Sequence, residues 1–370
     1  MKTITTKFPD LKPDYDISLL ANPEDILFLD IETTGLTPKN TNLYLIGCIY
    51  YKDEMWQSIQ WFAEKYEEEL AVLTAFFEFT GSFKYLVHYN GNKFDLPYLL
   101  AKCEEYQLDY NFDNLGGVDI YRRIFPYKEL MGLPDLKQKT VEEYLGISRD
   151  EDKSGRELIS DYHTYACEKS EVLLNELLSH NENDLKGMLY CVSMLAYSDL
   201  FNKPIRVMKA QANYFNNESK KRSQEIILKL KLTSPLPLQT SFRGLGCYFS
   251  GKGYDAFLKI PLFEEEMKYF YSNYKNYYYL PAEDIAMHKS MATCVDKAHR
   301  VQATAQNCYT RKKSLFLPQW EILFTPFFKR DYKAKDMFFE LSDEFKKSRS
   351  GFAMYAEHVL TKMLESGLDL

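Results

Sequence analysis

The first hundred residues alternate between short apolar runs and amphipathic segments. Three apolar runs, at residues 26–31, 43–51 and 55–62, have the length and composition of strands. The polar links between them are short, and the second is only KDE. Because short links favour antiparallel neighbours, we predict that these three runs form adjacent strands of one sheet.

The pattern then changes to helices that alternate with strands. Apolar residues recur at helical spacing within residues 63–79, at Leu70, Leu73, Phe76 and Phe77. A strand at 85–89 ends in the loop NGNKF, and a helix is expected at 95–106. A fifth strand is expected at 118–121, followed by a helix that starts at Pro134 and stops at Gly146. A long leucine-rich helix is expected at 168–196.

The order of these elements, β-β-β-α-β-α-β-α-α, predicts an α/β domain with a mixed five-stranded sheet flanked by helices. We place this domain at residues 25–200. Residues 1–24 contain three prolines and are expected to be an extended lead-in segment. The polar stretch NKPIRVMKAQANYFNNESKKRS is expected to be a connector, so that residues 201–370 form a C-terminal domain of unknown function, mainly helical.

The net charge of −7 conceals a difference between the two halves. Residues 1–200 hold 19 Lys and Arg against 35 Asp and Glu, whereas residues 201–370 hold 27 against 18. The basic C-terminal half is therefore a candidate for nucleic-acid binding. Simple drift in composition would explain the same numbers, and charge alone does not decide between the two.

Composition also bears on where the protein works. The seven cysteines are odd in number and include no CxxC pair, which favours free thiols and a reducing, cytoplasmic environment. We find no apolar run of membrane-spanning length, and the first 16 residues contain acidic residues and prolines where a signal peptide needs an apolar stretch. We therefore expect no membrane partner, and no protein partner is inferable.

Two carboxylates follow the most apolar run of the N-terminal half, ILFLDIETTG. Asp30 and Glu32 are two residues apart, a spacing that places both side chains on one face of a strand. Neighbouring acids repel one another unless a cation lies between them, so the pair resembles a set of metal ligands. Taken alone, it is equally well explained as one strand-end acid and one turn acid.

Two further acids strengthen the metal hypothesis. Asp95 follows another apolar strand in HYNGNKFDLP, and Asp184 lies in SHNENDL, four residues after His180. On a helix, this spacing puts His180 and Asp184 one above the other. Hard oxygen ligands from three elements, without a competing cysteine cluster, suit Mg²⁺ or Mn²⁺.

The three segments DIETTGL, HYNGNKFDLPYL and HNENDL, in this order, resemble the motifs of DEDD 3′–5′ exonucleases. The second resembles the NGxxFDxP form of family B DNA polymerase proofreading domains. The intervening LPDLKQKTVEEYLGISRDEDKSG, followed by HNENDL, resembles the YprB-type ribonuclease-H-like domain over about residues 25–200. Many polymerase-type members carry Tyr at the position of His180, whereas this chain combines histidine with the short three-residue gap before Asp184.

The resemblance implies a ribonuclease-H-like fold and a 3′–5′ exonuclease that hydrolyses DNA or RNA from its 3′ end with two Mg²⁺ or Mn²⁺ ions. It implies that Asp30 bridges both ions, that Glu32 and Asp184 complete one ion site and that Asp95 holds the other. It also implies that His180 acts on the attacking water. Substrate contacts are expected from the turn after the first motif and from the second motif, at Thr33, Gly35 and Asn90.

Other interpretations stay open. A structure-specific endonuclease and a non-catalytic nucleic-acid-binding module are the alternatives to an exonuclease. Asp119 is either a further site residue or a turn or cap carboxylate, and His88 is expected to be a core histidine. Seven aromatics within residues 269–279, interleaved with lysines, favour a core element over a base-stacking surface, and residues 311–313 are either phosphate contacts or a solvated turn.

Overall fold

The computed structural model describes residues 1–149, 153–216 and 222–367. Residues 150–152, in the segment that resembles the YprB-type domain, and residues 217–221, in the predicted connector, lie outside the described residues. The chain divides into two compact units. Unit 1 comprises Met1–Asn202 with Ser234–Leu238, and unit 2 comprises Lys203–Thr233 with Gln239–Leu370.

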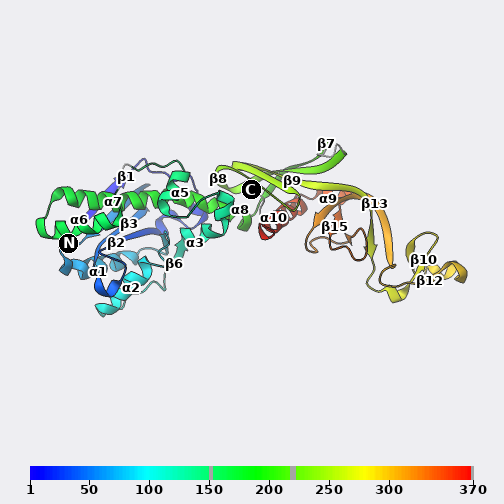
Figure 1. The fold of residues 1–370 in the computed structure, drawn as a ribbon, viewed down its shortest axis with the longest axis horizontal. Coiled ribbons are helices and arrows are strands. Elements are labelled where there is room, and N and C mark those ends of the chain that lie inside the picture. Colours follow the sequence, from blue (N-terminus) through cyan, green and yellow to red (C-terminus); the bar gives the residue numbers. More distant parts are fainter. Residues whose placement is uncertain (150–152, 217–221, 368–370) are drawn as a thin grey trace. The chain divides into compact units, whose positions relative to one another are not determined.

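Unit 1 is built on a six-stranded mixed sheet with the order β1-β4-β3-β2-β5-β6 (Figure 1). Its strands are β1 (Lys2–Phe8), β2 (Ile26–Thr33), β3 (Leu43–Lys52), β4 (Met55–Phe62), β5 (Tyr85–His88) and β6 (Gly116–Asp119). The first four neighbours pair antiparallel, and β2, β5 and β6 pair parallel. The predicted mixed α/β sheet is confirmed, but the predicted number of five strands is wrong.

The additional strand is β1, which lies in the segment expected to be a lead-in. It pairs with β4 along its whole length, from Lys2 opposite Phe62 to Phe8 opposite Trp56. Every second residue of β1 is partly buried and the others are exposed. Its sequence, KTITTKF, contains only two strongly apolar residues, so the half-buried edge strand has a weak apolar signal.

Helices cover both faces of this sheet (Figure 1). They are α1 (Glu69–Thr80), α2 (Asp95–Glu105), α3 (Ile120–Ile124), α4 (Lys128–Met131), α5 (Gln138–Tyr144), α6 (Gly155–Glu168), α7 (Glu171–Cys191) and α8 (Leu195–Asn202). The predicted helix at 168–196 is mostly α7, and a 3-10 turn at Val192–Met194 separates it from α8. The sequence did not predict α6, which begins with a capping box at Ser154 and Glu157.

The alternation of side chains along β2 sorts its residues between the two faces. Leu27, Leu29 and Ile31 are buried in the main apolar core, together with residues of α1 and α2. Asp30 and Glu32 have the opposite parity and face α7, which lies against β2 and β3. The sheet therefore presents its acidic pair on the face that packs against α7.

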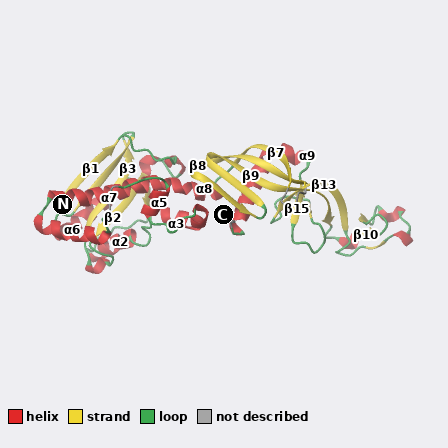
Figure 2. Cartoon of the chain, turned by 45° about the horizontal axis from the view of Figure 1, so that its top comes forward, coloured by secondary structure: helices red, strands yellow, loops and turns green. Residues whose placement is uncertain are grey.

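Unit 2 is rich in strands, so the prediction of a mainly helical C-terminal region is wrong (Figure 2). One sheet has the order β14-β15-β13-β9-β8-β7, and a three-stranded sheet has the order β11-β10-β12. The strands are β7 (Arg206–Asn216), β8 (Arg222–Gly244), β9 (Cys247–Phe270), β10 (Tyr277–Leu280), β11 (Ile285–His288), β12 (Val301–Gln302), β13 (Tyr309–Gln319), β14 (Phe327–Phe328) and β15 (Met337–Glu340). Its α-helices are α9 (Asp343–Lys347) and α10 (Arg349–Glu365).

The strands of unit 2 were missed because charged residues occupy their outer face. In β8, Leu228, Leu230 and Leu232 are buried while the intervening Lys229 and Lys231 are not. This period of two is the pattern of a strand that is half buried. The predicted polar connector contains β7, so the polar residues of Arg206–Asn216 belong to a sheet and not to a linker.

Candidate active site

The carboxyl ends of three parallel strands meet at one edge of the unit 1 sheet. Asp30 and Glu32 lie at the end of β2, and His88 and Asp119 end β5 and β6. Asp95 is the first residue of α2, a few residues after β5. Polar residues from separate parts of the chain therefore gather at the carboxyl ends of β2, β5 and β6.

Helix α7 supplies the remaining residues of the cluster. His180 Nε2 lies 3.2 Å from Asp184 Oδ2, one turn further along the helix, and 3.7 Å from Glu32 Oε1. One ligand atom from each of Glu32, His180 and Asp184 can be chosen so that all three lie within 4.8 Å of one another. Three residues of the predicted site are thus close enough to share a metal ion.

Asp30 is held by an asparagine that the sequence analysis did not single out. Asn181 donates from Nδ2 to Asp30 Oδ2 at 2.8 Å, and its Oδ1 accepts from Gln60 Nε2 at 2.9 Å. Asn181 is fully buried on α7, and Gly47, opposite Asp30 in β3, makes room for it. A Cβ at Gly47 would lie 1.9 Å from Asn181 Oδ1, so only glycine is compatible with this contact.

Burial and neighbouring negative charge both act on the carboxyls. Burial, followed by the charges of Asp184, Glu32 and Asp95, raises the pKa of Asp30 well above its ordinary value. Burial also raises the pKa of Asp95 to about 7, against opposing hydrogen bonds from the backbone at Asp95 and Ile31. Like charges gathered in a desolvated site are unfavourable unless protons or cations are present.

Asp184 differs from the other acids because it has cationic neighbours. Its carboxylate accepts a hydrogen bond from Arg149 Nη1 on Oδ1 and faces His180 on Oδ2. Burial alone would raise the pKa of Asp184, but the hydrogen bonds and charges of His180 and Arg149 lower it below its ordinary value. Arg149 also contacts both oxygens of Glu142, a buried residue of α5.

Of the three predicted substrate contacts, Thr33 ends β2, and Gly35 and Asn90 lie in the bends that follow β2 and β5. The Thr33 hydroxyl donates to the carbonyl of Gly35 at 2.8 Å, and a Cβ at Gly35 would meet Thr41 at 2.7 Å. Asn90 has a φ of 60°, and its backbone N–H donates to Asp119 at 3.0 Å. Within the described chain, the Asn90 Oδ1 is buried without a hydrogen-bond partner. Thr33, Gly35 and Asn90 remain predicted substrate contacts.

A second His–Asp pair at the same edge has a structural role. Asp119 caps the N-terminus of α3 by accepting a hydrogen bond from the Arg122 backbone N–H at 3.2 Å, as expected if it is a cap carboxylate. His88 is fully buried, and its Nδ1 accepts from the Gly91 backbone at 3.1 Å. Burial lowers the pKa of His88, which favours the neutral ring, although the nearby Asp119 opposes this shift.

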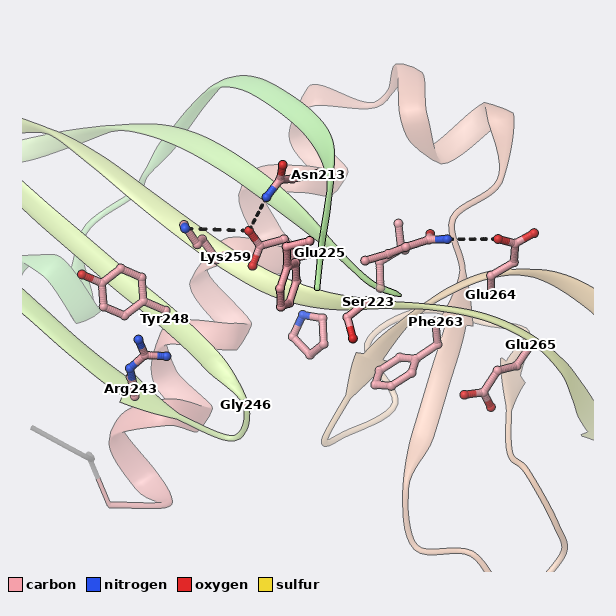
Figure 3. A pocket seen from close by; sticks show the side chains of 14 residues that line it. Asn213, Ser223, Glu225, Arg243, Gly246, Tyr248, Lys259, Phe263, Glu264 and Glu265 are labelled. Atoms are coloured by element: carbon pink, nitrogen blue, oxygen red, sulfur yellow. Dashed lines mark hydrogen bonds and ion pairs between the residues drawn. The ribbon is translucent and has the colours of Figure 1, made fainter. Parts of the chain in front are cut away.

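Unit 2 contains a cavity of about 950 Å³ at the edge of β7, β8 and β9 (Figure 3). Arg243 and Lys259 lie over the Tyr248 ring, at 4.8 and 5.9 Å from its centre. Among the lining residues that the structure describes, the charged ones are Arg243, Lys259, Glu225, Glu264 and Glu265, so carboxylates outnumber cations there. This described part of the lining does not have the charge expected of a phosphate-backbone site.

Residues 27–195, within unit 1, match the family model of the RNase H superfamily. The mixed sheet of unit 1 agrees with this match, so unit 1 has a ribonuclease-H-like fold. No curated protein sequence matches this chain. Among the described residues, no helix is long and apolar enough to cross a membrane.

The solved structures to which this chain is similar include a DNA polymerase and an exonuclease. The family B DNA polymerase of the archaeon Pyrobaculum calidifontis is 16% identical, with a TM-score of 0.39, over 48% of this chain and 26% of the polymerase. E. coli exonuclease I with a 5cy-dA13 oligonucleotide is 13% identical, with a TM-score of 0.27, over 56% of this chain and 54% of that chain. Because both TM-scores are below 0.5, the fold assignment rests on the sheet and the family match.

Proposed function

We propose that this protein is a divalent-metal-dependent nuclease, and specifically a 3′–5′ exonuclease that hydrolyses phosphodiester bonds of DNA or RNA. The observation that carries the proposal is the convergence of four carboxylates and one histidine on one edge of a ribonuclease-H-like sheet: Asp30, Glu32, Asp95, Asp184 and His180. The match to the RNase H superfamily supports the nuclease class.

The donor chemistry of the cluster fits divalent cations. Oxygen ligands from β2, α2 and α7 are the type preferred by Mg²⁺ and Mn²⁺. Burial raises the pKa of both Asp30 and Asp95, and the charges of Asp184, Glu32 and Asp95 raise that of Asp30 further, so divalent cations would stabilise the charged carboxylates. Asp30, Glu32, Asp95 and Asp184 would hold two such ions.

The chain's own residues have distinct parts in the proposed reaction. Two bound cations would supply an activated water and stabilise the leaving oxygen. His180 Nε2, at the mouth of the cluster beside Glu32 and Asp184, orients the attacking water or accepts its proton. Thr33, Gly35 and Asn90, in the flanking turns, position the terminal nucleotide.

The proposal is tested by incubating 5′-labelled single-stranded DNA and RNA oligonucleotides with the protein in Mg²⁺, Mn²⁺ or EDTA. We expect a metal-dependent ladder that shortens from the 3′ end, and about a hundredfold or greater slowing in His180→Gln. The exposed His299 of unit 2 provides the control, and His299→Gln should retain the wild-type rate.

Other outcomes would replace the proposal. Internal cuts in a circular substrate would show an endonuclease in place of an exonuclease. Salt-sensitive binding of oligonucleotides and duplexes without any cleavage would show a nucleic-acid-binding module and overturn the catalytic assignment.

A further inference from the structure

We propose that Arg149 is a positioning residue that fixes the orientation of Asp184 for metal binding. This inference rests on the proposed function, because it assigns a role to a residue that touches a proposed metal ligand. Arg149 lies in the segment between the second and third acidic motifs, and it is distant in the sequence from every residue predicted to form the site.

The guanidinium of Arg149 joins two carboxylates. Nε and Nη2 donate to the two oxygens of Glu142, and Nη1 donates to Oδ1 of Asp184. The other oxygen of Asp184, Oδ2, lies 3.2 Å from His180 Nε2. Arg149 thus occupies one oxygen of Asp184 and leaves the second oriented toward the cluster.

The Arg149–Glu142 pair is itself held rigidly. Glu142 is 1% exposed and lies on α5, and Gln138 of the same helix donates to Glu142 Oε1 at 2.9 Å. The same Gln138 nitrogen also donates to the backbone carbonyl of Asp184 at 2.7 Å, so α5 and α7 are tied at this point. Because Arg149 and Glu142 each make several hydrogen bonds, the arginine side chain has little conformational freedom.

Space for the pair depends on a glycine in α7. A Cβ at Gly187 would lie 1.9 Å from Glu142 Oε1 and 2.7 Å from Arg149 Nη2. Glycine in a helix interior is less favourable than alanine, so its presence here matches the steric need. The helix that carries Asp184 thus also makes room for the residues that orient it.

Geometry and charge predict opposite results when Arg149 is removed. If Arg149 were only a positive charge near the metal ligands, its removal would strengthen cation binding, and lysine would substitute for it. The negative charge of Glu142 already compensates the positive charge of Arg149. We therefore expect the effect of Arg149 on the orientation of Asp184 to outweigh the effect of its charge on cation binding. A lysine ammonium cannot reproduce the fork that spans two carboxylates.

The test is calorimetric titration of Mn²⁺ into wild type, Arg149→Met and Arg149→Lys, with melting temperatures as a check on folding. We expect Mn²⁺ affinity to fall about tenfold in both variants, the usual consequence of losing a group that orients a metal ligand. The exposed Arg156→Ala, seven residues away on α6, is the matched control and should bind like wild type.

Wild-type affinity in both Arg149 variants, tighter binding in Arg149→Met, or full rescue by lysine would each overturn the positioning role. If Arg149→Met does not fold, Arg149→Lys alone decides, since it keeps the charge and most of the side chain. Failure of the wild type to bind Mn²⁺ at all would overturn the proposed function and this inference together. Binding by wild type with unchanged variants would overturn only this inference.

Discussion

Unit 1 and unit 2 arrange their charged residues differently. In unit 1, Asp30 and Asp95 share one desolvated site with Glu32 and Asp184, and burial raises the pKa of both. In unit 2, cations lie beside acids at the surface, as in Arg311–Glu266 at 3.2 Å and Lys312–Glu340 at 2.7 Å. Clustered like charges destabilise a fold, so they indicate a site, whereas surface pairs need no function to explain them.

The largest effect should come from removing the most central acid. Asp30→Asn keeps the shape of the side chain and can still accept from Asn181, but it removes one charge from the cluster. We expect nuclease activity to fall by at least about a thousandfold, through weakened metal ligation. We also expect a higher melting temperature in EDTA, because the repulsion among the acids decreases.

The exposed Asp109→Asn is the control, and neither quantity should change in it. Normal activity in Asp30→Asn would show that the acidic cluster of unit 1 is not needed for activity. The cluster would then indicate a site no better than the surface ion pairs of unit 2 do.

A steric change should disturb the cluster without altering its charge. In Gly47→Ala, the new methyl group would collide with Asn181, so we expect a loss of about 1–3 kcal/mol in unfolding free energy and reduced activity through Asp30. Gly117→Ala on β6 is the matched control, because nothing lies within 4 Å of its Cβ position. Equal stability of the two variants in urea titrations would contradict the proposed packing.

The pH dependence of stability provides a third test. The pKa of Asp95 is about 7 in the folded protein and near 3.9 when unfolded, so between these values the folded state binds the extra proton. The stability of the metal-free protein should therefore fall as pH rises from about 4 to 7, and Asp30 acts in the same direction. Asp184, with its lowered pKa, contributes only below about pH 4.

Melting temperatures in EDTA at pH 5 and pH 7.5 would measure this effect. The decrease should be smaller in Asp95→Asn, and Mg²⁺ should largely remove it in wild type. An increase in stability over this range, unaffected by Asp95→Asn, would show that the buried charged carboxyls do not destabilise the metal-free fold as described.

The smallest effect belongs to unit 2. Lys312→Ala removes the partner of Glu340 from an exposed pair, and we expect a change of about 0.5 kcal/mol or less in unfolding free energy. Its activity in low salt should equal that of wild type. A large loss of activity would show that unit 2 contributes charges to substrate binding, and the two units would then share the function.

The sequence predicted the parts of the fold that have strong local patterns. The apolar runs of β2, β3 and β4 and the helical spacing in α1 were identifiable because each is nearly all apolar or clearly periodic. The strands β1, β7 and β8 were not identified, because polar residues occupy their exposed positions and dilute the apolar signal.

The residues of the candidate site also differ in how strongly the local sequence pattern indicates them. Its acids could be proposed from motifs at strand ends and from the spacing of His180 and Asp184. Asn181 had a weaker signal, as a polar residue within the row of buried leucines Leu174, Leu177 and Leu185 on α7. Arg149 and Gly47 had no local signal, because their contacts join residues that are distant in the sequence.

The central claim is that the acidic cluster of unit 1 binds divalent cations. The most direct test is an anomalous difference map from crystals of the protein grown with Mn²⁺. We predict manganese peaks bounded by carboxylate oxygens of Asp30, Glu32, Asp95 and Asp184, and none in crystals of Asp30→Asn at the same concentration. An ordered wild-type cluster without a manganese peak, or peaks only elsewhere in the molecule, would contradict the claim.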